Sequence, residues 1–143
     1  MDGPMSTRPE YFLDTAFAIA LASKSDAFHQ DAIELAKSLK TTRARLVTTR
    51  AVLLEIGNAL SKQRYRAGAV TLLSALEADP QVQIISLTNQ LYHEALGLFQ
   101  ARPDKEWGLT DCVSFVVMQQ MSITDALTTD DHFRQAGFRV LLA

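Results

Sequence analysis

The chain has 143 residues, a formal net charge of −2 and an apolar fraction of 48%. This length is typical of one domain, and this apolar fraction excludes an intrinsically disordered protein. No apolar run reaches the roughly 20 residues that cross a bilayer, and the single cysteine, Cys112, excludes an internal disulfide. We therefore expect one cytoplasmic domain over residues 1–143 with no membrane contact, in which residues 1–9 form a short tail rather than a signal peptide.

Short apolar runs alternate along the chain with longer segments of helical periodicity. In chain order, the pattern predicts a strand at 11–13, helices at 17–22 and 28–39, a strand at 46–48, helices at 52–60 and 67–78, a strand at 82–85, helices at 91–99 and 109–121, a strand at 123–127, a helical turn at 131–135 and a strand at 138–142. Asp26 is expected to cap the second helix and Thr49 the third.

Helical segments separate the predicted strands from one another. Parallel strands need crossover connections, and a crossover usually contains a helix. The predicted fold class is therefore α/β, a three-layer α/β/α sandwich with a parallel sheet. The sequence contains no glycine-rich phosphate loop and no internal repeat.

Basic residues are concentrated in one part of this mildly acidic chain. Eight basic residues and one acid lie between Lys37 and Arg66. Such a strip can guide a phosphodiester backbone toward a site, because phosphate contacts dominate nucleic-acid affinity, but from charge alone a solvated helix face is the favoured explanation. The candidates for contact with a nucleic-acid backbone are Arg50, Lys62, Arg64 and Arg66.

Four acidic residues interrupt or adjoin apolar runs in separate segments, namely Asp14, Glu55, Asp111 and Asp130. Acids are rarely buried without a partner, and a hard divalent cation is the usual partner of convergent carboxylates. Three of the four lie near the predicted carboxyl ends of strands, where parallel sheets bind ligands, and Glu55 lies one turn into a helix. The sequence therefore predicts a site for Mg²⁺ or Mn²⁺.

Each of these acids also has a purely structural explanation. Asp is a common helix N-cap, so Asp14, Asp111 and Asp130 could each begin a helix. Glu55 lies inside a helix, where a surface position is the competing explanation. Four such coincidences are less probable together than any one alone, which favours a shared site.

Several neighbours of the acids are further candidates. Thr15, Thr110 and Thr128 can be helix caps or hydroxyl partners that position the acids. His132 could be a general acid or a metal ligand, but a surface or packing role is favoured because no base partner lies at a recognisable spacing. Cys112 lies in an apolar run, which favours a buried structural thiol over a nucleophile.

Four segments carry a resemblance to a known family. They are 12–15 (FLDT), 54–60 (LEIGNAL), 109–115 (LTDCVSF) and 126–133 (ALTTDDHF), the last followed by Gly137 and Phe138. At these residues the sequence resembles the PIN-domain ribonucleases, particularly the VapC-like toxins of bacterial toxin–antitoxin pairs. The resemblance spans nearly the whole chain.

The resemblance implies a Rossmann-like sheet, a metal-dependent endoribonuclease activity on RNA, a homodimer and a cognate antitoxin that covers the site. It also implies that Asp14, Glu55, Asp111 and Asp130 hold the Mg²⁺ or Mn²⁺ ion. The family's final motif places its acid two residues after a Thr and three before a Phe, which selects Asp130 over the adjacent Asp131. The implied reaction is hydrolysis of a phosphodiester by water that the metal activates, with no side-chain nucleophile.

Two other hypotheses accompany this one. A catalytically silent PIN-like module that binds metal or a partner is the alternative function, whereas a phosphoacceptor receiver domain fits poorly because residues 86–88 contain no Asp. The antitoxin is expected to lie along a groove between helices. The residues that could border that groove, for which core packing is the favoured explanation, are Phe17, Leu21, Leu72 and Leu73.

Overall fold

The computed structural model describes residues 8–142, and within them five parallel strands form one sheet in the order β3-β2-β1-β4-β5. The strands are β1 (Glu10–Leu13), β2 (Arg45–Thr49), β3 (Val82–Ile85), β4 (Asp125–Leu127) and β5 (Arg139–Val140). The helices are α1 (Thr15–Ala22), α2 (His29–Thr41), α3 (Arg50–Ala59), α4 (Gln63–Ala78), α5 (Asn89–Ala101), α6 (Leu109–Gln120) and α7 (Asp131–Gln135).

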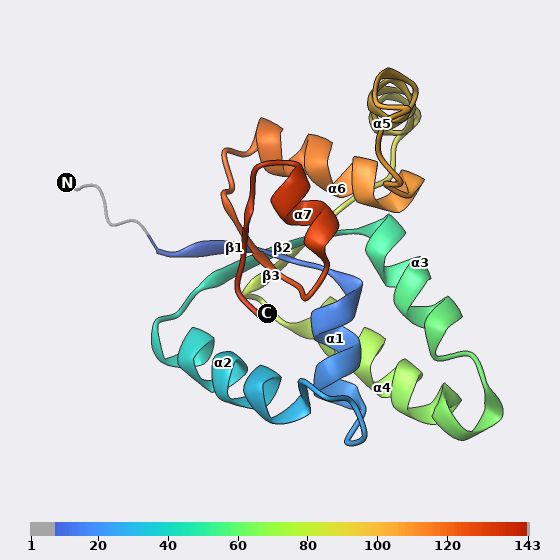
Figure 1. Ribbon diagram of the computed structural model, residues 1–143. Helices are drawn as coiled ribbons and strands as arrows, with labels where there is room; N and C mark the ends of the chain where they lie inside the picture. The colour runs from blue at the N-terminus through green and yellow to red at the C-terminus, as the bar shows by residue number, and fades with distance from the viewer. Residues whose placement is uncertain (1–7, 143) are drawn as a thin grey trace.

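Helices cover both faces of the sheet, with α1, α2 and α4 on one side and α5, α6 and α7 on the other (Figure 1). Alternate strand residues supply the two cores, since successive side chains of a strand point to opposite faces. Phe12 and Ala126 belong to the core beneath α6, whereas Leu13 and Leu127 belong to the core beneath α1 and α2. The predicted three-layer α/β/α fold with a parallel sheet is therefore confirmed.

The order of the strands reverses at the boundary between β1 and β4. From β1 the chain proceeds to β2 and β3 on one side, and then returns to place β4 on the other side of β1. Open parallel sheets bind ligands in the crevice that such a reversal leaves beyond the carboxyl ends of the strands. Asp14 follows β1 and Asp130 follows β4, so both lie beside this crevice.

Aromatic packing fixes the position of α7 against α6. The ring centroid of Phe115 lies 4.9 Å from that of Phe133 and 5.0 Å from that of Trp107, both in edge-to-face contact. Gly137 follows α7 with a φ of +96°, which favours glycine, and the turn brings Phe138 to 5.7 Å from Phe115. These contacts fix α7, the short helix that follows Asp130, against the core.

Some predicted boundaries differ from those observed. The fourth helix begins at Gln63 instead of residue 67, because its first turn is polar and shows no apolar period. Asp26 does not cap α2, since Phe28 occupies the N-cap position and Asp26 Oδ1 accepts a hydrogen bond (2.8 Å) from the Phe28 backbone N–H in the preceding turn. The fourth and fifth strands are shorter than predicted, at three and two residues.

The expected tail at residues 1–9 lies largely outside the described residues. Of its described part, the Arg8 guanidinium donates hydrogen bonds to the Arg43 carbonyl and to the side chain of Gln81. Among the helices of residues 8–142, none combines the length and the apolar character needed to cross a membrane.

Candidate active site

Asp14 is a buried carboxylate at the point where β1 gives way to α1. Only 4% of the residue is exposed, and its Oδ2 accepts a hydrogen bond (2.8 Å) from the Thr128 hydroxyl. It occupies the N-cap position of α1 but makes no side-chain capping bond, so capping does not explain its burial. The pKa of Asp14 is raised to about 7, mainly by burial and to a smaller extent by the negative charges of Asp111 and Glu55. Ionised Asp14 costs free energy in this buried position unless a cation lies beside it.

Thr128 joins the two sides of the crevice. Its hydroxyl donates to Asp14 after β1 and accepts a hydrogen bond (3.0 Å) from the Asp130 backbone N–H after β4. Thr128 is fully buried, and so is its hydrogen bond to Asp14, while the bond from the Asp130 N–H is partly buried. That Thr128 positions the acids for function stays a prediction, with these contacts as its basis.

Asp111 and Asp130 extend from the beginnings of α6 and α7. Asp111 is not the N-cap of α6, since Gly108 takes that position and donates its backbone N–H (3.1 Å) to Asp111 Oδ2. Asp130 is the N-cap of α7, and its Oδ1 accepts a hydrogen bond (2.9 Å) from the His132 backbone N–H. Burial raises the pKa of Asp111, and the charge of Asp130 adds to that effect. Helix capping therefore explains one oxygen of each acid, but not the convergence of the two acids.

Glu55 reaches the site from the middle of α3. It is half-buried, and the Thr15 hydroxyl donates a hydrogen bond to its Oε1. A solvent-exposed surface position therefore does not explain Glu55. Thr15 therefore has the predicted positioning contact. Thr110 does not, because no hydrogen bond joins its hydroxyl to any of the four acids within residues 8–142, although its carbonyl accepts one from Ser114.

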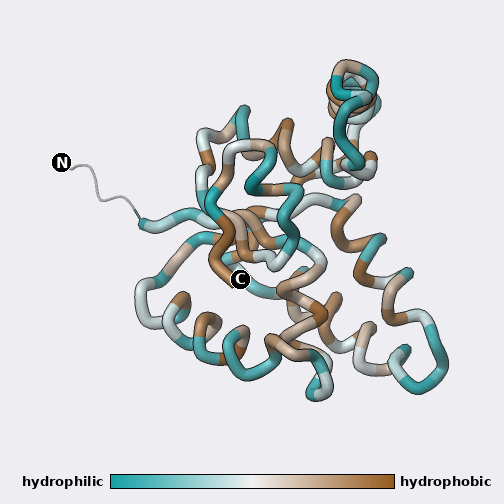
Figure 2. Tube along the Cα trace, viewed as in Figure 1, coloured by the Kyte–Doolittle hydropathy of each residue, from teal (hydrophilic) through white to brown (hydrophobic). Residues whose placement is uncertain are grey.

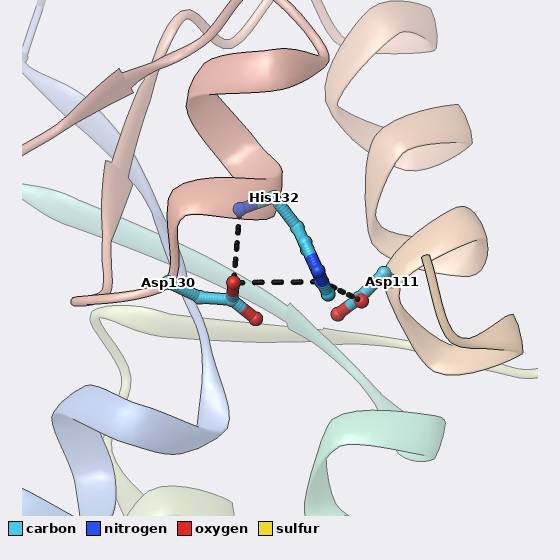
Figure 3. Close-up of side chains that lie close together, drawn as sticks. All are labelled: Asp111, Asp130 and His132. Carbon is cyan, nitrogen blue, oxygen red and sulfur yellow. Dashed lines mark hydrogen bonds and ion pairs between the residues drawn. The ribbon is translucent and has the colours of Figure 1, made fainter. Parts of the chain in front are cut away.

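His132 belongs to the site, and the favoured prediction that it has a surface or packing role was wrong. Its Nδ1 lies 3.0 Å from Asp111 Oδ2 and 3.5 Å from Asp130 Oδ1 (Figure 3). Burial lowers the pKa of His132, but the hydrogen bond to Asp111 and the neighbouring carboxylates outweigh it and raise the pKa overall. The position of His132 beside Asp130 could have been predicted from the sequence. An Asp that caps a helix accepts the backbone N–H two residues later, which holds that residue beside the Asp.

The donor set fits a divalent cation. Asp111, Asp130 and His132 each place one ligand atom within 4.8 Å of the others, and the pKa of Asp14 reflects the nearby charges of Asp111 and Glu55. No Arg or Lys of residues 8–142 forms an ion pair with any of the four acids. Carboxylate oxygens that converge without an Arg or Lys partner are ligands that Mg²⁺ and Mn²⁺ take up in proteins.

The family model of the PIN domain matches residues 11–139. This chain belongs to the PIN domain family. The domain is 29% identical over 127 residues to the 23S rRNA-specific endonuclease VapC20 of two Mycobacterium tuberculosis strains, an alignment that covers 89% of this chain and 94% of that protein. The crystal structure of M. tuberculosis VapC20, a sarcin-ricin loop cleaving toxin, matches this PIN domain with a TM-score of 0.78 at 28% identity over 90% of this chain and 95% of that one.

Two more distant structures share the fold of this PIN domain. VapBC2 from Rickettsia felis, bound to a DNA fragment from its promoter, matches with a TM-score of 0.66 at 15% identity over 92% of this chain and 97% of that one. FitAcB from Neisseria gonorrhoeae matches with a TM-score of 0.63 at 16% identity over 92% of this chain and 96% of that one. The family model and the two VapC20 comparisons confirm the resemblance to VapC-like PIN toxins. The two more distant structures show that the fold is shared more widely.

The basic candidates of the PIN domain lie apart from its acids. Arg50, at the start of α3, forms an ion pair (2.9 Å) with Glu77 of α4. Lys62 lies in the connection beyond the opposite end of α3, about 15 Å along its ten residues, and Arg64 and Arg66 lie in the first turn of α4, where the chain is largely hydrophilic (Figure 2). Their contact with RNA stays a prediction.

Cys112 is fully buried, and burial raises the pKa of its thiol, which agrees with the predicted structural role. A burial-raised thiol pKa disfavours the thiolate that a nucleophile needs.

A cleft of about 310 Å³ adjoins Glu55 between α3, α5 and α6. Its rim carries three large apolar side chains that are unusually exposed, Leu54 at 61%, Tyr92 at 39% and Leu87 at 37%. Exposed apolar groups that gather in one place often mark a binding surface. This face of the domain is therefore a candidate for contact with a partner.

Proposed function

We propose that this PIN domain is a divalent-metal-dependent endoribonuclease that hydrolyses RNA phosphodiester bonds and acts as the toxin of a toxin–antitoxin pair. The observation that carries the proposal is the buried Asp14 carboxylate, which lies near the charges of Asp111 and Glu55 and forms no ion pair with an Arg or Lys of residues 8–142. Similarity over most of the chain to an endonuclease that cleaves 23S rRNA supports the same activity.

Asp14, Asp111 and Asp130 would hold the Mg²⁺ or Mn²⁺ ion, and Glu55 would complete the ligand set or orient the attacking water. Such an ion supplies positive charge to the phosphate and activates water for attack. The protein's own contribution is to fix the carboxylates in advance: Thr128 holds Asp14, and Thr15 holds Glu55. Ligands held in this way lose little freedom when the ion and the RNA bind.

The proposed substrate is RNA, and ribosomal RNA is the first substrate to test because the similar VapC20 is specific for 23S rRNA. Lys62, Arg64 and Arg66 are exposed around the start of α4 and remain proposed contacts for the RNA backbone beyond the cleavage point. Arg50 is a weaker candidate, because its guanidinium already pairs with Glu77. Such contacts would weaken with rising salt.

Two protein partners are part of the proposal. A second copy of the chain would cover the exposed apolar rim formed by Leu54, Leu87 and Tyr92. The antitoxin would use an apolar groove of about 280 Å³ between α1, α2 and α4, to which Phe17 and Leu21 contribute as predicted. Leu72 and Leu73 instead pack against the larger core, so their predicted place in the groove is not supported.

The test is RNA cleavage by the purified chain. We expect cut products from total RNA or 23S rRNA in Mn²⁺ or Mg²⁺ and none in EDTA. Stoichiometric metal binding with no cleavage of any RNA pool would instead favour the catalytically silent module. A short neighbouring gene for a DNA-binding protein would support the toxin–antitoxin assignment.

A further inference from the structure

His132 faces the acids with a ring nitrogen. Its Nδ1 lies 3.0 Å from Asp111 Oδ2 and 3.5 Å from Asp130 Oδ1, and the three ligand atoms come from the first turns of α6 and α7 (Figure 3). A lone-pair nitrogen and two carboxylate oxygens repel one another at these distances. Something positive must therefore lie among them, either a proton on the ring or a metal ion.

The spacing suits a metal ion. Neighbouring ligands of an octahedral ion with bonds of about 2.1 Å lie roughly 3 Å apart, which is close to the two separations from His132 Nδ1. The oxygens are also held in place beforehand, since Asp130 Oδ1 accepts the His132 N–H (2.9 Å) and Asp111 Oδ2 accepts the Gly108 N–H (3.1 Å). An ion could enter this triad without a rearrangement of the backbone.

We propose that His132 Nδ1 is a ligand of the divalent ion at this site, so that Asp111, Asp130 and His132 form a mixed nitrogen and oxygen triad that prefers Mn²⁺ to Mg²⁺. The inference rests on the proposed metal site and adds to it both a ligand and a metal preference. Imidazole nitrogen binds transition-metal ions well, whereas Mg²⁺ selects oxygen ligands. A site built from carboxylates alone would discriminate less between the two ions.

Pulsed electron paramagnetic resonance of the Mn²⁺-loaded chain tests the inference directly, because a coordinated imidazole modulates the electron spin echo. We expect ¹⁴N modulation in the wild type and its loss in His132→Asn. His93→Asn is the matched control: His93 is exposed on α5, its Nδ1 forms a hydrogen bond with the Asn89 carbonyl (2.7 Å), and the modulation should persist. In titrations, we expect His132→Asn to weaken Mn²⁺ binding by at least about tenfold and Mg²⁺ binding by less than about threefold.

Wild-type chain labelled with ¹⁵N-histidine provides a second test that needs no variant. Histidine occurs only at His29, His93 and His132, and the ¹⁴N modulation should be replaced by that of ¹⁵N. Unfolding curves in EDTA show whether His132→Asn is folded.

Wild-type protein without nitrogen modulation would overturn the inference, as would modulation that survives in folded His132→Asn. An equal loss of Mn²⁺ and Mg²⁺ affinity would do so too, because it would show that His132 only positions the acids. These results are separate from the nuclease assay. Nitrogen coordination without RNA cleavage would refute the proposed function alone, and Mn²⁺-dependent cleavage without nitrogen coordination would refute this inference alone.

Discussion

The Thr128 hydroxyl donates a 2.8 Å hydrogen bond to Asp14 across the boundary between β4 and β1, 114 residues apart in the chain. The same oxygen accepts the Asp130 backbone N–H at 3.0 Å. One buried hydroxyl therefore sets the positions of two of the proposed metal ligands. This contact lies at the point where the order of the strands reverses, which is where open parallel sheets bind their ligands.

Replacing this hydroxyl should destabilise the fold and weaken metal binding together. Thr128→Val keeps the shape of the side chain but leaves Asp14 without its donor and the Asp130 N–H without its acceptor. We expect a loss of about 1–3 kcal/mol in the free energy of unfolding, measured by urea denaturation in EDTA. Thr128→Ser retains the hydroxyl and is the control. A valine variant as stable as the serine variant would contradict this role.

The stability of the metal-free protein should fall as the pH rises. The pKa of Asp14 is about 7 in the folded chain against an ordinary value of 3.8, so the folded state binds its proton more tightly than the unfolded state does. Between about pH 4 and pH 7 the free energy of unfolding should therefore decrease, by at most about 4 kcal/mol, and stay reduced above pH 7. Urea denaturation in EDTA across this range measures the effect.

Two comparisons isolate the contribution of Asp14. Asp14→Asn cannot ionise, so its free energy of unfolding should not fall between about pH 4 and pH 7. The variant retains an oxygen that can accept a hydrogen bond from the Thr128 hydroxyl. Saturating Mg²⁺ should also remove the fall in unfolding free energy in the wild type, because the ion stabilises the ionised carboxylate and binds only the folded chain. An identical pH profile for wild type and Asp14→Asn in EDTA would show that the carboxyl is not responsible.

The aromatic contact between α6 and α7 should be essential for the site. Phe133 is fully buried, with its ring 4.9 Å from Phe115 and 6.3 Å from Phe12. We expect Phe133→Ala to cost about 3–5 kcal/mol in unfolding free energy and to weaken Mn²⁺ binding, since α7 carries His132 and is capped by Asp130. Phe99, which is 46% exposed, is the control, and Phe99→Ala should cost far less.

The apolar rim beside Glu55 should mediate self-association. Leu54 is 61% exposed, and Leu54→Lys would place a charge in the proposed dimer contact. We expect this variant to sediment as a monomer with an unchanged unfolding transition in dilute solution. Val70, 60% exposed on α4, provides the matched control, and Val70→Lys should leave the dimer intact. A wild type that is monomeric at all concentrations would refute the proposed dimer.

The fold and three of the acids could be predicted because they follow from local pattern and topology. Alternation of apolar strands with helices implies a parallel sheet, and the carboxyl ends of parallel strands lie on one edge. Asp14 and Asp130 follow β1 and β4, and Asp111 lies in the first turn of the helix before β4. Their convergence thus needed no knowledge of side-chain packing.

The contacts that could not be predicted depend on tertiary packing. His132 meets Asp111 because Phe115 and Phe133 hold α6 and α7 together, which no spacing in the sequence encodes. Arg50, a candidate for contact with the RNA backbone, pairs with Glu77, 27 residues later, and no local spacing in the sequence indicates that pair. The polar first turn of α4 concealed the true start of that helix at Gln63.

RNA cleavage by the wild type and by Asp14→Asn, side by side in Mn²⁺ and in EDTA, tests the central claim most directly. Urea denaturation first establishes that both chains are folded. We expect the wild type to cut 23S rRNA or another RNA in total cellular RNA only when the metal is present, and Asp14→Asn to be slower by roughly 100-fold or more. Equal cleavage by the two folded chains, or undiminished cleavage in EDTA, would contradict the account.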